Sequence, residues 1–154
     1  MIRGRYLNST RDCDEVFALR RRVFVEEMGL DEAWARDAGD DMAVYVLAYD
    51  EAGAPSGTGR LSIDQDRFML GRVCVLEGAR GSGLGDLIAR MLLLRARELN
   101  APRVYVNALT SAAPFYARYG FRPTDEPDEE GCVLMRAEAD EIDLGSDCGG
   151  MEPE

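Results

Sequence analysis

The chain contains no histidine and no lysine, and both absences exclude kinds of site. All 18 of its basic residues are arginine. Without lysine there is no nucleotide-binding loop of the form G-x-x-x-x-G-K-[ST], in which the lysine reaches the terminal phosphates. Without histidine there are no mixed Cys/His zinc ligands. The four cysteines lack CxxC spacing, so we expect neither a metal site nor a disulfide framework; they are Cys13, Cys74, Cys132 and Cys148.

Long apolar runs are also missing. Apolar runs such as residues 91–94 are far below the roughly 18–20 residues that cross a bilayer, and residues 1–5 lack the apolar segment of a signal peptide. We therefore expect a soluble, cytoplasmic protein without a membrane partner. A length of 154 residues with 46% apolar content suits one domain with one core.

The chain is strongly acidic, with a formal net charge of −11. This charge argues against nucleic acid as a partner, because the only basic run is residues 20–22. The same field favours a cationic small substrate. The acidic residues in the N-terminal half that could attract such a substrate are Glu26, Glu27, Asp31, Glu32, Asp37, Asp40 and Asp41.

Apolar periodicity predicts an α/β fold with the element order β-α-(α)-β-β-β-α-β-α-β. A helix capped by Ser9 or Thr10 follows the first strand, and residues 31–41 form an acidic loop or short helix. The expected strands are 2–7, 43–49, 57–63, 67–76, 103–108 and 131–137, and the later helices are 84–99 and 111–119. We expect one domain over residues 1–137 and an acidic, mobile tail over 138–154.

A glycine-rich turn at residues 80–85 lies between a β-branched strand and a strongly helical run. Such a turn points backbone N–H groups and the positive end of a helix dipole at an anion, typically a phosphate. The dinucleotide pattern G-x-G-x-x-G fails, because its sixth position is Asp86 counted from Gly81 and Ile88 counted from Gly83. A purely structural turn remains an alternative reading.

The pattern that does fit is R-x-x-G-x-G, formed by Arg80, Gly83 and Gly85, and it resembles the pyrophosphate loop of the GNAT superfamily of acetyl-CoA-dependent N-acyltransferases. A second segment, 115–121, resembles the F-Y-x-x-x-G-F signature after the fifth strand of that fold. Residues 20–27 are similar to the R-x-x-V-F-V-x-E start of a bacterial subgroup, and also to acyl-homoserine-lactone synthases, which share the fold. The resemblance covers the chain to about residue 137.

The resemblance implies a mixed sheet whose central strands splay apart and hold the pantetheine arm of acetyl-CoA in the gap. Buried backbone groups left unpaired by such a gap need a partner, which the pantetheine amides supply. The loop amides and Arg80 are expected to hold the pyrophosphate. The residues expected to bind the cofactor are Val73, Cys74, Val75, Arg80, Gly81, Ser82, Gly83, Leu84, Gly85, Asp86 and Asn107.

The catalytic roles implied by the resemblance begin with Tyr116 as the general acid, which protonates the departing thiolate. The base is open. Many family members carry a glutamate on the strand before the loop, but this chain has Arg72-Val73-Cys74 there, so the candidates are Glu26, Glu27 and Asp64, or a water relay. The oxyanion donor is expected to be a backbone N–H near Val75. Tyr116 could instead serve only in packing, and each candidate carboxylate could instead be an ordinary surface charge.

These observations predict an N-acetyltransferase that passes the acetyl group directly to a primary amine of a small molecule or peptide. A direct route is expected because no cysteine has a histidine base and no serine triad is apparent. An enzyme similar to acyl-homoserine-lactone synthases and a CoA-binding module without catalysis are the alternatives. The acceptor depends on loops 27–41 and 109–114, and the assembly is open, a homodimer being the commonest.

Overall fold

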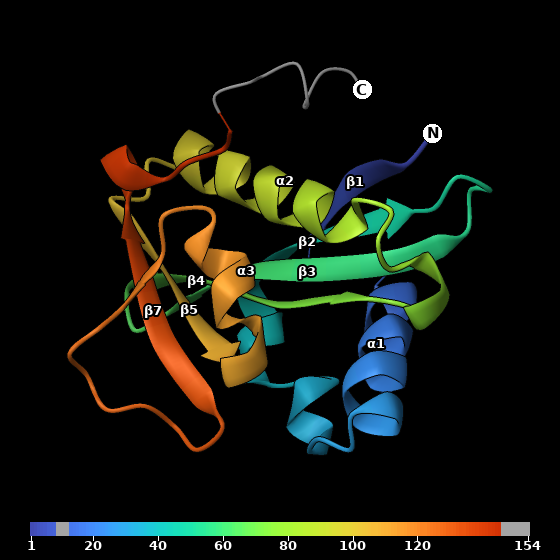
Figure 1. Ribbon diagram of the computed structural model, residues 1–154, viewed down its shortest axis with the longest axis horizontal. Coiled ribbons are helices and arrows are strands. Elements are labelled where there is room, and N and C mark those ends of the chain that lie inside the picture. The colour runs from blue at the N-terminus through green and yellow to red at the C-terminus, as the bar shows by residue number, and fades with distance from the viewer. Residues whose placement is uncertain (9–12, 146–154) are drawn as a thin grey trace.

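Seven strands form one mixed sheet in the order β1-β2-β3-β4-β5-β7-β6 (Figure 1). The computed structural model describes residues 1–8 and 13–145. Neighbouring strands pair antiparallel, except β4 and β5, which are parallel. The strands are β1 (Arg3–Asn8), β2 (Ala43–Tyr49), β3 (Pro55–Asp64), β4 (Arg67–Val75), β5 (Arg103–Leu109), β6 (Arg122–Pro123) and β7 (Cys132–Glu138). The predicted fold class is confirmed; only β6, two residues long, had no periodic signal to reveal it.

The helices also follow the predicted order. Helix α1 (Asp14–Arg20) continues as a π-helical segment, η1 (Arg21–Glu27), and is followed by α2 (Leu84–Glu98) and α3 (Ala113–Ala117). The expected acidic segment 31–41 forms two 3-10 turns, η2 (Glu32–Trp34) and η3 (Ala38–Met42), and three further 3-10 turns are η4 (Glu77–Ala79), η5 (Thr110–Ala112) and η6 (Ala139–Glu141). The predicted caps Ser9 and Thr10 lie outside the described residues. No helix in the described part is long and apolar enough to span a membrane.

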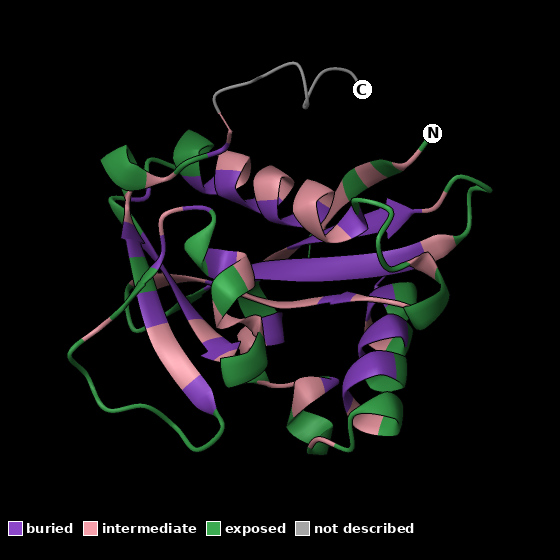
Figure 2. Ribbon diagram, in the orientation of Figure 1, coloured by how far each residue is buried: buried purple, intermediate pink, exposed green. Residues whose placement is uncertain are grey.

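Helices cover both faces of the sheet. Helix α2 lies across one face, and its buried side chains, Ile88 and Leu92 among them, form the larger core (Figures 1 and 2). Helix α1 packs on the opposite face, against Tyr45 and Leu47 of β2. Strand β2 is therefore buried on both sides, which explains why it is an almost unbroken apolar run rather than an alternating one.

Helix α2 approaches the sheet closely because β3 carries glycine beneath it. A Cβ at Gly59 would lie 2.6 Å from Ile88 Cγ2 and 2.9 Å from Leu92 Cδ1. Real Cβ atoms are not tolerated at such distances, so the small residue sets how near the helix can lie. The close fit fixes the helix, and with it the glycine turn at its N-terminus, relative to β3 and β4.

The first part of the expected tail packs on the domain. Leu144 is buried against the main core, and the Asp143 amide donates to the Tyr119 carbonyl at 2.9 Å. Arg90 donates from Nη1 to the Leu144 carbonyl. Packing therefore continues past residue 137, because Ile142 and Leu144 supply apolar contacts that two isolated residues do not reveal in a sequence. Residues 146–154 of the expected tail lie outside the described residues.

Candidate active site

The two central strands separate, as the resemblance implied. Strands β4 and β5 pair only at Phe68 with Val104, at Met69 with Tyr105 and at Leu70 with Val106. Beyond Leu70 the two strands continue without pairing to each other, toward Val75 and Leu109 respectively. Backbone groups along these facing edges are thus available to a ligand, the arrangement that a pantetheine arm requires.

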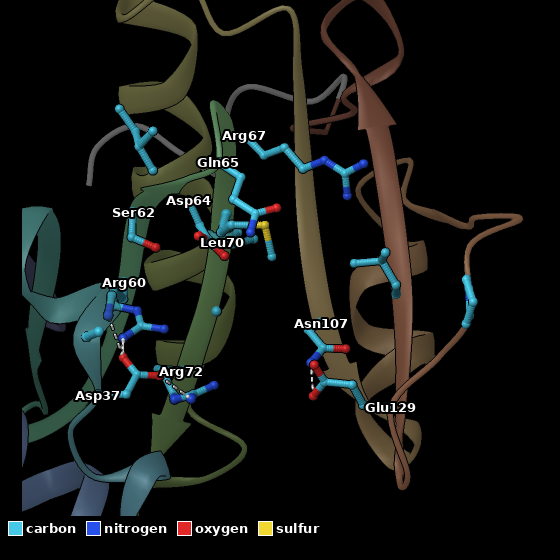
Figure 3. A pocket seen from close by; sticks show the side chains of 17 residues that line it. Asp37, Arg60, Ser62, Asp64, Gln65, Arg67, Leu70, Arg72, Asn107 and Glu129 are labelled. Carbon is cyan, nitrogen blue, oxygen red and sulfur yellow. Dashed lines mark hydrogen bonds and ion pairs between the residues drawn. The ribbon is translucent and has the colours of Figure 1, made fainter.

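A β-bulge begins the separation. The register between β3 and β4 passes from Arg60 opposite Gly71 to Thr58 opposite Cys74, so two residues of β4 face Gly59 alone. One of these two, Arg72, has φ +52°, a left-handed conformation that is uncommon for arginine. Bulges of this kind bend a strand and redirect a side chain. Here the bulge lies where the Arg72 side chain extends over the cavity described below (Figure 3).

The glycine turn has the geometry of an anion site at the start of α2. Gly81 has φ +83°, and the N-cap residue Gly83 has φ +92°, with no side chain capping the helix. The N–H groups of the first turn are therefore open to a ligand. Gly85 is already helical, and a Cβ there would lie 3.6 Å from the Phe115 ring, so its small size leaves space rather than permitting an unusual φ.

The side chains of the other loop residues predicted to bind cofactor, Leu84, Ser82 and Asp86, already have partners within the protein. The Leu84 side chain is buried in the core, so only its backbone faces a ligand. Ser82 donates from Oγ to the Ala79 carbonyl. Asp86 accepts hydrogen bonds from Arg90 Nε, at 2.9 Å, and from the Tyr119 hydroxyl. These bonds hold its carboxylate against Arg90 and Tyr119 rather than toward the glycine turn.

Arg80 and Glu27, predicted as a pyrophosphate ligand and a base, contact each other. The Arg80 guanidinium donates from both Nη atoms to the Glu27 carboxylate, each at 2.7 Å, and from Nε to the Val75 carbonyl at 3.0 Å. The hydrogen bonds from Arg80 lower the pKa of Glu27, which makes it a weaker base. Glu26, like Glu27, is exposed on η1.

Tyr116 and Cys74 lie in the buried part of the site. Tyr116 packs edge-on against Phe115 and Phe121, and burial raises the pKa of its hydroxyl, with the charge of Cys74 adding to the effect. The hydroxyl therefore stays protonated at neutral pH, as a proton donor must be. Burial likewise raises the pKa of the Cys74 thiol to about 12, so a thiolate is disfavoured there.

A cavity of about 580 Å³ opens beside the parted strands. Its walls bring together two predicted site residues, Asp64 and Asn107, with polar residues that sequence reasoning did not assign to a site (Figure 3). Asn107 donates from Nδ2 to Glu129 at 3.0 Å on one side, while Arg60 and Arg72 lie on the other. The residues of the glycine turn do not line it, so cofactor loop and cavity are separate parts of the site.

Arg60 and Arg72 form one side of the cavity, here called the arginine wall, and a chain of ion pairs supports it. Arg20 donates from both Nη atoms to Asp40 at 2.7 and 3.1 Å, and both side chains are almost fully buried. Arg60 Nη1 lies 2.6 Å from Asp37 Oδ1 and 3.1 Å from Asp40 Oδ1. Arg72 Nη2 donates to Asp37 Oδ2 at 2.8 Å. The network joins α1, η3, β3 and β4 behind the cavity.

Four residues of the acidic cluster form ion pairs with arginine side chains. Asp37 and Asp40 pair with arginines of the network, Glu27 pairs with Arg80, and Glu32 pairs with Arg21. Sequence reasoning counted these charges without their partners. One signal was available: an arginine at position 60, in the middle of an apparently buried strand, requires a carboxylate partner.

Comparison with known proteins identifies the family. The Acetyltransferase (GNAT) domain matches residues 10–136, and the chain belongs to this family. The uncharacterized N-acetyltransferase YjcF of Bacillus subtilis is 31% identical over 112 residues, which are 73% of this chain and 79% of YjcF. GNAT membership and the acetyltransferase class predicted from the motifs are thereby confirmed.

Solved structures agree with this assignment. An acyl-CoA N-acyltransferase from Pseudomonas aeruginosa superposes with a TM-score of 0.75 at 25% identity, covering 89% of this chain and 99% of that one. The PaiA N-acetyltransferase of Thermoplasma acidophilum, solved in complex with coenzyme A, gives a TM-score of 0.68 at 14% identity, with 90% and 99% covered. The latter likeness concerns the fold alone.

In the described part of this chain, no group of three or more His, Cys, Asp or Glu residues is placed to hold a metal ion.

Proposed function

We propose that this protein transfers an acetyl group from acetyl-CoA directly to a primary amine of a small molecule or peptide. The observation that carries the proposal is the separation of β4 and β5 beyond Leu70, beside the uncapped N-terminus of α2. An open backbone edge and an open helix N-terminus match the two polar parts of CoA, its amide-containing arm and its pyrophosphate. The CoA complex of the structurally similar PaiA supports the assignment.

The residues of this chain divide the work of binding. The amides at Gly81 to Gly85 would face the pyrophosphate, with Arg80 exchanging Glu27 for the phosphate oxygens. The backbone of Val73 to Val75, with Asn107 across the gap, would face the pantetheine arm. A Val75 N–H near the reacting carbonyl would stabilise its developing negative charge.

Proton transfers fall to the buried and cavity-lining groups. Tyr116, protonated because it is buried, would give its proton to the departing thiolate. For the amine, Asp64 is the predicted base that lines the cavity, whereas Glu27 is held by Arg80. Glu26 and a water relay remain the other candidates. Cys74, whose thiol has its pKa raised to about 12, is a poor nucleophile, which favours direct transfer over an acetylated enzyme.

Calorimetric titration with acetyl-CoA tests the cofactor site, with ATP and NAD as control ligands. We expect micromolar binding of acetyl-CoA alone, weakened by Arg80→Ala and lost in Gly83→Asp, which places a carboxylate at the helix N-terminus. Arg122→Ala, an exposed arginine on β6, is the matched control. A folded protein that ignores acetyl-CoA would refute the proposal.

Two alternatives share the fold and are separated by turnover. Thiol release from acetyl-CoA with a panel of amines distinguishes the transferase from a non-catalytic CoA-binding module. Consumption of S-adenosylmethionine would indicate the synthase that the N-terminal R-x-x-V-F-V-x-E segment also resembles. We place the protein in the bacterial subgroup with that segment, and in the cytoplasm, as the sequence predicts.

A further inference from the structure

The arginine wall of the cavity holds more positive than negative charge. Asp40 is shared by Arg20 and Arg60, and Asp37 is shared by Arg60 and Arg72. Three guanidinium groups therefore share two carboxylates, which leaves one positive charge uncompensated within the network. The member nearest the parted strands is Arg72, next to the bulge of β4.

Two nitrogen atoms of this wall lack protein partners. The Nε atoms of Arg60 and Arg72 are both buried and make no hydrogen bond within the described residues. Arg60 itself is more than nine-tenths buried. An unpaired buried donor is costly, and the cost is greater for a charged group, so such donors usually have a ligand or a water. Burial lowers the pKa of Arg72 to about 10, with the neighbouring charge of Arg60 adding to the effect, whereas Asp37 and Asp40 raise the pKa of Arg60.

We propose that this wall binds the carboxylate of the acceptor, so that the substrate is an amine that also carries a carboxylate, such as a free amino acid. The inference deepens the proposed function, on which it rests. A carboxylate of charge −1 balances the single excess charge, whereas a phosphate dianion exceeds it and a polyamine would be repelled. Figure 3 shows Arg60 and Arg72 facing the cavity from the side of β3 and β4.

The opposite wall suits the other end of such a molecule. Glu129, held by Asn107, lies across the cavity from the arginines, and Asp64 also lines the cavity, on the same side as Arg60 (Figure 3). A zwitterion bound with its carboxylate on Arg72 would have acidic groups available for its ammonium group. The cavity adjoins the end of the β4–β5 pairing at Leu70 and Gly71, where the amine would meet the thioester.

The substrate test compares matched acceptors in the acetyl-CoA thiol-release assay. The panel is the free L-amino acids, their carboxamides, aminomethylphosphonate and spermidine. We expect transfer to one or more amino acids, with each carboxamide at least roughly tenfold poorer in kcat/KM, as loss of a charge-assisted hydrogen bond predicts. Carboxamides, the phosphonate or spermidine serving as well as the amino acids would overturn the inference.

The residue test uses Arg72→Gln, with Arg72→Lys to keep the charge and Arg122→Gln on exposed β6 as the control. We expect Arg72→Gln to raise KM for the amino acid by roughly ten- to a hundredfold and the lysine variant to lie between. The affinity for acetyl-CoA should not change in any of them. If Arg72→Gln affects amino acid and carboxamide equally, the carboxylate does not bind there.

A binding measurement separates this inference from the proposed function. In ¹H–¹⁵N spectra of the arginine side chains, the Arg72 Nε–H resonance is assigned from the Arg72→Gln spectrum. It should shift with one or more of the free L-amino acids and not with their carboxamides. Such a shift in a protein that does not turn over acetyl-CoA would keep the carboxylate site and reject the transferase. Turnover without any shift would keep the transferase and reject the site.

Discussion

Glu27 and Arg80 form a bidentate ion pair, with both Nη–Oε distances at 2.7 Å, that joins η1 to the segment before the glycine turn. The pair occupies the guanidinium that would meet the pyrophosphate. Since Arg80 also donates to the Val75 carbonyl, its Nε already has a partner while its two Nη atoms are the exchangeable ones. Under the proposed function, the pyrophosphate and Glu27 would compete for the same two donors.

Releasing Arg80 should strengthen cofactor binding. Glu27→Gln removes the competing charge, and we expect acetyl-CoA affinity to rise by up to about fivefold, the factor an exposed ion pair is commonly worth. Calorimetry at low and at 0.5 M salt measures it, and screening should shrink the difference. Glu26→Gln, on the same exposed segment, is the control. If Glu27→Gln instead abolishes turnover while binding improves, Glu27 serves as the base.

Removing one hydroxyl should separate the two tyrosines of the second motif. We expect Tyr116→Phe to lower kcat by about 10²–10⁴-fold without changing acetyl-CoA affinity, because the ring packing is kept and the proton donor is lost. Tyr119→Phe, whose hydroxyl bonds Asp86 instead, should retain kcat and lose about 1 kcal/mol of stability. Steady-state kinetics and urea unfolding measure the two effects. Equal kcat values for both variants would exclude Tyr116 as the acid.

The buried Arg20–Asp40 pair should govern acid stability. Burial alone raises the pKa of Asp40, but hydrogen bonds from Arg20 and the Asp37 amide outweigh it and hold that pKa well below its usual range. Its stabilising effect is full above the unfolded carboxyl pKa of about 3.9 and is lost as the pH falls toward the lower folded value. Asp40→Asn should cost about 3–5 kcal/mol at pH 7 and flatten this dependence.

Urea unfolding between pH 2 and 7 measures that dependence, with Glu15→Gln on the exposed face of α1 as the control. The control should unfold like the original protein at each pH. An Asp40→Asn curve that keeps the original acid slope would place the responsible carboxylate elsewhere.

The glycine turn before α2 could be predicted from the sequence because it is built from contiguous residues. Gly81 and Gly83 adopt positive φ, a conformation that favours glycine, so their residue type alone indicated the turn. Tyr116 was equally visible within its motif. The periodicity of residues 84–99 predicted α2 to within one residue for the same reason: local contacts determine local structure.

The ion-pair network beside the cavity could not be predicted in this way. Asp37, Arg60 and Arg72 are far apart in the chain and carry opposite charges, so their meaning depends on which pairs with which. Counted one by one, the acidic residues suggested a cationic substrate. In the folded protein, two of them, Asp37 and Asp40, pair with three arginines.

The sequence by itself thus determined the family, the order of elements and the glycine turn before α2, because each depends on residue types at fixed short spacing. Only the tertiary structure decided that β4 bulges at Arg72, that Glu27 holds Arg80, and that three arginines share two carboxylates. Those facts follow from strand register and from packing between distant segments, where burial makes every charge depend on its neighbours.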